Sequence, residues 1–258
     1  MNFFKEIFDY RQMIFSLVHK DLRGRYLGTL LGFLWTFVNP LLQLLVYNLI
    51  FSVVFRNGIE RFYLFLFIGL VPWMFFSSCV VGGSTSVISA SSMVTKIYFP
   101  REVLPIAYVT SSFVNMLLCF IVVFLIVFIS GISFNIAVWI YLPLVMIIEY
   151  VMGLGVAMIV SSLTVYFRDL EHILGILTMA WMYLTPILYT FDTVPEGIRR
   201  ILSLNPMKPV IEAYQSILYY AKAPELDTMI QAVFFGVVMV FIGFIIFNLL
   251  KRKFAEEL

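Results

Sequence analysis

Long runs without Asp, Glu, Lys or Arg alternate along the chain with short charged segments. The uncharged runs cover 26–55, 62–95, 103–148, 150–167, 173–191 and 228–250. About 20 helical residues cross a hydrocarbon core of about 30 Å, so the third run is too long for one crossing and divides at the turn-like segment 130–135. The pattern predicts six transmembrane helices over 29–54, 62–84, 105–129, 136–162, 173–191 and 228–250. Strands of a membrane β-barrel alternate over only about ten residues, so the unbroken runs favour an all-α protein.

Two segments outside these spans are amphipathic. Apolar residues recur with helical spacing over 10–25, which predicts an N-terminal helix lying along the membrane interface. This helix either anchors in lipid or packs against a cytoplasmic partner. The external segment 192–227 carries two short apolar stripes, and Pro195 and Pro209 stand where first-turn prolines belong. We expect two short gate helices there, in or dipping into the outer interface between the fifth and sixth spans.

The composition agrees with a single membrane domain over 1–258. Hydrophobic residues make up 62% of the chain and charged residues 12%, whereas soluble domains have about 45–50% and about 25%. These values exclude a soluble globule, a disordered chain, a nucleic-acid-binding domain and a disulfide scaffold. Cys79 and Cys119 lie in apolar runs without histidine neighbours, so we expect buried thiols and no metal site. Charged residues near the N-terminus interrupt any cleavable signal peptide.

The basic residues predict the orientation. With six spans both termini share one side, and 11 of the 17 Lys and Arg fall there: Lys5, Arg11, Lys20, Arg23, Arg25, Lys96, Arg101, Arg168, Lys251, Arg252 and Lys253. The opposite side carries Arg56, Arg61, Arg199, Arg200, Lys208 and Lys222. Because positive charge marks the cytoplasmic side of a membrane, both termini are expected to lie on the cytoplasmic side.

The sequence lacks recognisable catalytic, metal-binding and nucleotide-binding motifs. Glu149 is the only acid or base well inside a predicted span, and it has no obvious cationic partner. No nucleophile–base constellation or metal-ligand spacing is evident. No glycine is followed by lysine, so the chain has no phosphate-binding P-loop. The chain is therefore not expected to be an enzyme or to carry a cofactor, and any ATP and Mg would be bound by a separate ATPase chain.

Three groups of residues are candidates for other roles. The inner loops at 96–105 and 168–172 suit docking of a cytoplasmic partner, although their rings would equally anchor at lipid headgroups. Arg23 and Arg25 suit a phosphate at the cytoplasmic entrance, or simply the positive-inside anchor. Five rings lie deeper than an interfacial belt, and they either line a passage for sugars or pack helices: Trp35, Phe37, Tyr47, Trp181 and Tyr183. The candidates for lining the passage are Trp35, Tyr47, Trp181 and Tyr183.

The order of several short motifs resembles the permeases of polysaccharide-export ABC transporters, a group that includes O-antigen (Wzm-like), teichoic-acid and capsule exporters. The motifs are Asp21–Tyr26, Leu31–Trp35, Asn39–Leu42, Pro72–Phe76, Lys96–Pro105, Tyr166–Asp169, Thr185–Tyr189 and Asn205–Met207. The resemblance covers about residues 10–250. Each motif is weak alone, and their order and spacing together are specific.

The resemblance implies a homodimer bound to two copies of a cytoplasmic ABC ATPase, exporting a lipid-linked polysaccharide. It assigns the inner loops to ATPase coupling, through Lys96, Tyr98, Phe99, Pro100, Arg101, Arg168 and Asp169, and the outer gate to Asn205, Pro206 and Met207. A drug or lipid exporter of the same fold is the alternative within transport. From another class, the alternative is a membrane-embedded transferase acting on a lipid-linked sugar. The motifs do not identify the glycan.

Overall fold

The computed structural model describes residues 3–25, 28–54, 58–132 and 135–258. Tyr26 of the first motif, Arg56 and the middle of the 130–135 turn lie outside the described residues. Over the described ranges the chain forms helices and connecting turns without a β-strand. The prediction of an all-α protein is confirmed for this part of the chain.

Five helices in the described ranges are long and apolar enough to cross a membrane, and they coincide with five of the six predicted spans. They are Gly32–Ser52, Phe62–Ser84, Val103–Ile129, Ile136–Tyr166 and Leu226–Lys253. Their elements are η1 (Gly32–Leu34), α3 (Trp35–Asn48), η2 (Leu49–Val54), α4 (Phe62–Ser84), α6 (Val103–Ile129), α7 (Ile136–Trp139), α8 (Tyr141–Tyr166), α12 (Leu226–Leu250) and η5 (Lys251–Lys253).

The helix expected at 173–191 is shorter than the sequence predicted. α9 (Leu170–Tyr183) has 14 residues, which gives about 21 Å at 1.5 Å per residue, less than the roughly 30 Å of a hydrocarbon core. Pro186 follows closely; it lacks a backbone N–H and disfavours helical geometry in the residue before it. The absence of charge beyond Tyr183 therefore did not mean a continuous helix, and the count of six spans stays a prediction.

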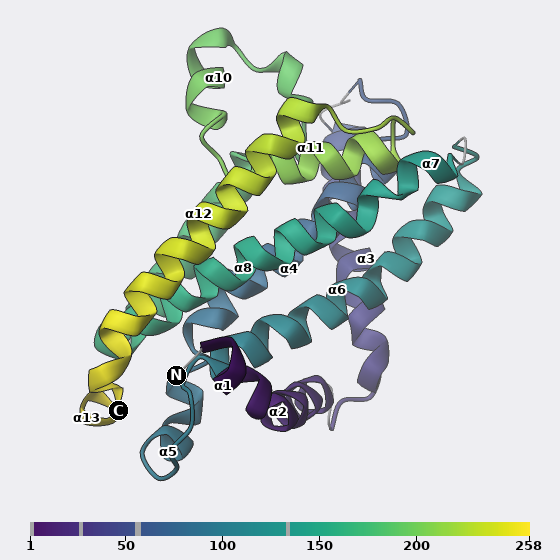
Figure 1. Ribbon diagram of the computed structural model, residues 1–258. Coiled ribbons are helices and arrows are strands. Elements are labelled where there is room, and N and C mark those ends of the chain that lie inside the picture. The colour runs from purple at the N-terminus through teal and green to yellow at the C-terminus, as the bar shows by residue number, and fades with distance from the viewer. Residues whose placement is uncertain (1–2, 26–27, 55–57, 133–134) are drawn as a thin grey trace.

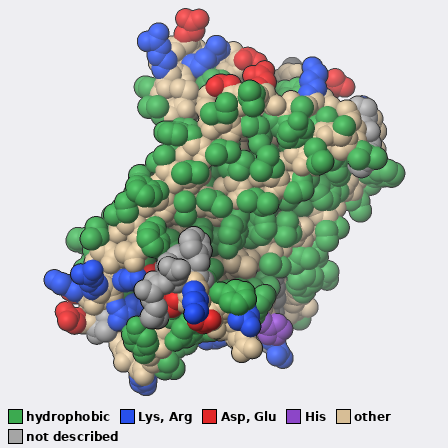
Figure 2. All heavy atoms as spheres, viewed as in Figure 1, with side chains coloured by type: hydrophobic (Ala, Val, Ile, Leu, Met, Phe, Trp, Pro, Cys, Tyr) green, Lys and Arg blue, Asp and Glu red, His purple; other side chains and the backbone are tan. Residues whose placement is uncertain are grey.

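α4 forms the centre of the bundle, where it packs against α3, α6, α8, α9 and α11. α12 runs along α8 over much of its length (Figure 1). Figure 2 shows the result on one face: a broad band of hydrophobic side chains between two ends at which charged side chains gather. This distribution is the one expected for a protein whose middle lies in lipid.

The predicted external region contains η4 (Phe191–Thr193), α10 (Glu196–Leu202) and α11 (Met207–Leu218). α10 stands apart at one end of the molecule (Figure 1), with Ile198 and Ile201 more than half exposed. α11 instead packs against α4, α8 and α12. Its predicted apolar stripe is at most 1% exposed: Val210, Ile211, Tyr214, Ile217 and Leu218. α11 is therefore a helix inserted into the bundle, and we call it the inserted helix.

The opposite end holds both chain termini and is called the terminal end (Figure 1). It carries α1 (Phe3–Asp9), α2 (Arg11–Gly24), η3 (Ile88–Ala90), α5 (Ser91–Val94) and α13 (Phe254–Glu257). α2 is the amphipathic helix predicted over 10–25, and it packs on α6. Its apolar face, with Met13 and Leu17, lies against a cluster that includes Phe99 and Phe254. That face is thus partly covered by its own chain.

Candidate functional site

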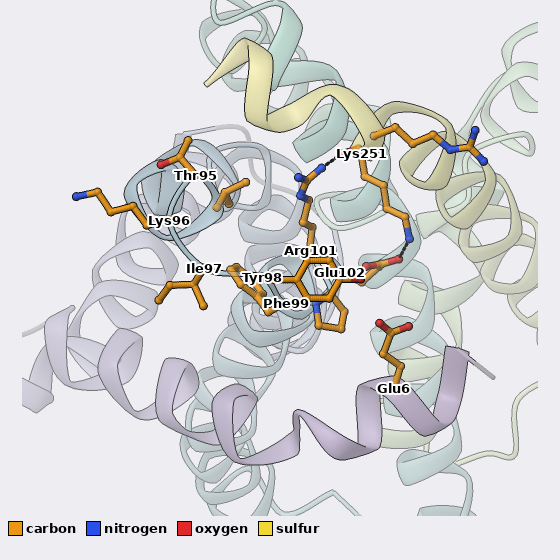
Figure 3. Close-up of a pocket in the computed structure, with 12 residues that line it drawn as sticks. Glu6, Thr95, Lys96, Ile97, Tyr98, Phe99, Arg101, Glu102 and Lys251 are labelled. Atoms are coloured by element: carbon orange, nitrogen blue, oxygen red, sulfur yellow. Dashed lines mark hydrogen bonds and ion pairs between the residues drawn. The ribbon is translucent and has the colours of Figure 1, made fainter. Parts of the chain in front are cut away.

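A cavity of about 430 Å³ opens at the terminal end, beside the first predicted docking loop (Figure 3). It is lined by Glu6, residues 94–102, Lys251 and Arg252. Four of the lining side chains are cationic and two are acidic, so its surface is net positive: Lys96, Arg101, Lys251 and Arg252 against Glu6 and Glu102. Such a cavity suits a partner surface that brings acidic and apolar groups.

The two neighbouring aromatic residues of this loop face opposite ways. Tyr98 is 88% exposed, whereas Phe99 is 5% exposed. Phe99 belongs to the cluster that also contains Val94, Val103 and Phe254, and Pro100 is buried as well. The loop thus offers Tyr98 and the exposed Lys96 to a partner, while Phe99 holds the loop against the bundle.

The segment after α12 is bonded to the same loop. The Arg101 guanidinium donates to the backbone carbonyl of Lys251, and the Lys251 ammonium pairs with the Glu102 carboxylate (Figure 3). Glu102 is 2% exposed. The Tyr166 hydroxyl donates to the Leu250 carbonyl at 2.9 Å. These contacts were not predicted from the sequence, because their partners lie far apart along the chain.

The second predicted docking segment also lies at this end of the bundle. Arg168 and Asp169 connect α8 to α9, are exposed, and line a cavity of about 600 Å³ together with Tyr166. Tyr166 also contacts the segment after α12, through Leu250 and the Phe254 ring. The end of α12 therefore contacts the first docking loop and, through Tyr166 at the end of α8, lies next to the second.

The two predicted entrance arginines are placed differently. Arg23 is exposed at the end of α2. The Arg25 guanidinium donates to the Asp21 carboxylate at 2.8 Å and to the Ser111 and Ser112 hydroxyls at 3.2 and 2.9 Å. The charge of Arg25 is thus largely balanced by Asp21, one helical turn earlier, and the network fixes α2 on α6.

The four predicted channel rings do not share one surface. Tyr47 lines a groove of about 420 Å³ between α3, α4 and α9 with Gln43, Trp73, Ser77, Thr178 and Met182. Trp35 lines a separate cavity of about 200 Å³ with Arg25. Trp181 packs edge-on against Trp73 and Phe76, with ring centroids 6.3 and 5.2 Å apart. Tyr183 is 51% exposed at the end of α9.

The side chain of the predicted gate residue Asn205 forms hydrogen bonds that connect α9 to the inserted helix. Its side-chain oxygen accepts from the Trp181 indole N–H at 2.9 Å and from the Met207 backbone N–H at 3.0 Å. Its side-chain nitrogen donates to the Leu184 carbonyl and the Thr185 hydroxyl at 3.1 and 2.9 Å. Asn205 therefore fixes the start of α11, after Pro206, against the end of α9.

The inserted helix provides the partner of Glu149 that sequence reasoning missed. The Tyr214 hydroxyl donates to Glu149 Oε2 at 2.6 Å, and both residues are fully buried. The other carboxyl oxygen, Oε1, has no hydrogen-bond partner within the described part of the chain. A fully buried carboxyl that accepts a hydrogen bond from one hydroxyl favours a structural role for Glu149.

Comparison with known proteins gives one family and several relatives. The model of the ABC-2 type transporter family matches residues 12–219. The chain is 35% identical to the O-antigen export system permease protein RfbA of Myxococcus xanthus, over 98% of both chains. It is 33% identical to an RfbA of Klebsiella pneumoniae over 95% of both chains. The polysialic acid transport protein KpsM of Escherichia coli is 24% identical over 90% of this chain and 91% of its own.

Proposed function

Because the chain belongs to the ABC-2 type transporter family, we propose that it is the membrane-spanning subunit of an ATP-driven exporter that moves a lipid-linked polysaccharide of the O-antigen type across the bacterial cytoplasmic membrane. The observation that carries the proposal is the end-to-end similarity to the O-antigen export permease RfbA. KpsM, whose name gives polysialic acid as its cargo, extends the similarity to a second polysaccharide transporter.

The exporter takes its energy from a separate ABC ATPase that docks on the terminal end, with two copies of each chain. The absence of a P-loop from the sequence supports a separate ATPase. The net positive cavity and the exposed Tyr98 support this end as the docking face, because aromatic residues and arginine are enriched in interface anchors. The positive-inside rule supports a cytoplasmic location for the same end.

A second copy of the chain completes the passage. The groove at Tyr47 is lined by the polar side chains of Gln43 and Ser77, which belong to helices long and apolar enough to cross a membrane. Polar groups facing hydrocarbon are costly, whereas two such grooves face to face would enclose a polar, aromatic conduit. Of the four predicted rings, Tyr47 is the one that this groove offers to the conduit, whereas Trp35, Trp181 and Tyr183 lie outside the groove.

The entrance and the exit follow from the same assignment. Arg23 and Arg25 receive the pyrophosphate of the lipid carrier at the cytoplasmic side, because a guanidinium matches phosphate oxygens with two parallel donors. The inserted helix and Asn205–Met207 form the outer gate. The location of Asn205 between α9 and α11 supports this role.

The test is deletion of the gene in the source bacterium and complementation from a plasmid. We expect surface polysaccharide to disappear and its lipid-linked form to accumulate in the cytoplasm, with both effects reversed by the plasmid copy. Affinity purification of the tagged chain from native membranes should also recover an ABC ATPase. Unchanged surface polysaccharide in the deletion strain would refute the proposal.

A further inference from the structure

The segment that follows α12 is bonded to the loop that precedes α6. We call this contact the clasp and define it by Arg101, Glu102, Lys251 and Phe254. Glu102 stands immediately before α6 and Lys251 immediately after α12. The ion pair between them therefore joins the start of one spanning helix to the end of another (Figure 3).

The clasp is held at more than one point. Besides the ion pair, the Arg101 guanidinium donates to the Lys251 carbonyl and lies 5.9 Å from the centre of the Phe254 ring. Phe254 is fully buried and meets the Phe247 ring of α12 edge-on at 5.5 Å. Two polar bonds and a ring contact at different places prevent the loop from sliding along the end of α12.

A tight helix contact continues from α12 into the bundle. A Cβ built on Gly243 of α12 would lie 2.3 Å from the carbonyl oxygen of Gly155 in α8, so the two backbones touch. On α8, Glu149 lies less than two turns from Gly155 and binds Tyr214 of the inserted helix. Bonded or touching groups thus lead from the docking loop to α11 at the far end.

We propose that Glu102 and Lys251 are positioning residues through which a displacement of the 95–102 loop is passed to α12, and from α12 to the inserted helix. This inference rests on the proposed function, because it concerns how ATP hydrolysis in the docked partner is coupled to movement of the glycan. Buried ionic pairs add little net stability against apolar replacements, and their best-attested use is to fix a register. Here the pair fixes the register between the loop and α12.

The neighbouring cations distinguish this role from membrane anchoring. Lys253 is exposed and lies two residues after Lys251. Lys253→Gln therefore removes one positive charge from the same end of α12 without touching Glu102. Lys251→Met keeps the length of the side chain and removes only its charge and donors, so the two variants form a matched pair.

The experiment uses the full exporter with its ATPase, assembled in membranes at matched protein levels. We measure ATPase co-purification, ATP hydrolysis and glycan moved. Lys251→Met should lower the glycan moved per ATP hydrolysed by the co-purified ATPase by about fivefold or more, the lower end of typical coupling between sites. Lys253→Gln should move glycan as the wild type does. The double variant Glu102→Lys with Lys251→Glu reverses both charges and should restore transport. If that variant does not accumulate, the double variant Glu102→Gln with Lys251→Gln, in which two amides replace the ion pair, is tested for restored transport instead.

Two results overturn the clasp. One is normal transport per ATP in Lys251→Met. The other is a parallel loss of protein, hydrolysis and transport that neither paired variant restores, because this marks a role in folding alone. A wild-type exporter that moves no glycan contradicts the proposed function instead. Equal transport by wild type and Lys251→Met contradicts only the clasp.

Discussion

Replacing Gly243 by alanine tests the closest helix contact in the bundle. The new Cβ would lie 2.3 Å from the Gly155 carbonyl oxygen and 3.0 Å from its Cα. Carbon–oxygen contacts of about 3.3 Å are already close, so α12 must move away from α8 by about 1 Å. Gly236→Ala is the matched control on the same helix, because its Cβ would meet the Ile148 carbonyl oxygen at 3.4 Å.

The expected cost follows from this displacement. A gap of about 0.5–1 Å forfeits a quarter to a half of the dispersion attraction between the separated atoms. Overpacking typically costs about 1–3 kcal/mol, and we expect the upper end because neither backbone can rotate away. The gain in helix propensity, about 1 kcal/mol, is common to both variants and cancels between them. About 3 kcal/mol corresponds to a melting temperature lower by roughly 6–12 °C for a chain of this size.

The assay compares the two variants purified in one detergent. After heating at one rate, the fraction that remains monodisperse in size-exclusion chromatography gives an apparent melting temperature; a fixed rate is needed because such unfolding is irreversible. If Gly243→Ala and Gly236→Ala melt within about 2 °C of each other, a difference of about 0.5–1 kcal/mol at this size, the backbones of α8 and α12 are not in close contact and the argument is refuted.

Three further predictions follow from the site. Tyr98→Ala should reduce recovery of the ATPase at unchanged melting temperature, whereas Phe99→Ala should destabilise the chain by about 3–5 kcal/mol. If Tyr98→Ala destabilises the chain and Phe99→Ala reduces only recovery of the ATPase, the two rings do not have the orientations described. Trp181→Phe keeps one six-membered aromatic ring and loses the pyrrole ring with its hydrogen bond to Asn205. The melting temperature should therefore fall by the equivalent of at least about 0.5–1.5 kcal/mol, and an unchanged value would show that the bond contributes nothing. Lysine at both Arg23 and Arg25 should lower export at matched protein level because lysine lacks the bidentate fork. Full export would leave Arg23 as a positive-inside anchor and Arg25 as a link between α2 and α6.

The spans were predictable because long uncharged runs are set by membrane thickness alone. The α4 prediction, 62–84, coincides with Phe62–Ser84. The failure at 173–191 came from using charge as the criterion, although Pro186 was visible and marks a probable helix end. The Asp21–Arg25 pair was also readable, because residues four apart share a helix face.

The site was less predictable because its contacts join distant parts of the chain. Glu149 and Tyr214 are 65 residues apart, and Tyr214 lies in a segment that reads as an external loop. Tyr98 and Phe99 have the same character in the sequence and lie outside any helix, so no periodicity tells which one points inward. Phe99 is the buried one of the two because it packs in the cluster that contains Phe254, a residue far away in the sequence.

The position of the inserted helix constrains the order in which the protein can be built. Synthesis releases the chain from its N-terminus, so α4 and α8 enter the membrane before α12 exists. The place that receives α11 is formed by α4, α8 and α12 together, and it is incomplete until residues 226–250 have been inserted. A nascent chain stalled before that point leaves the Glu149 carboxyl without its native surroundings inside the membrane. Insertion of α12 therefore completes the site that receives α11 and encloses the Glu149 carboxyl.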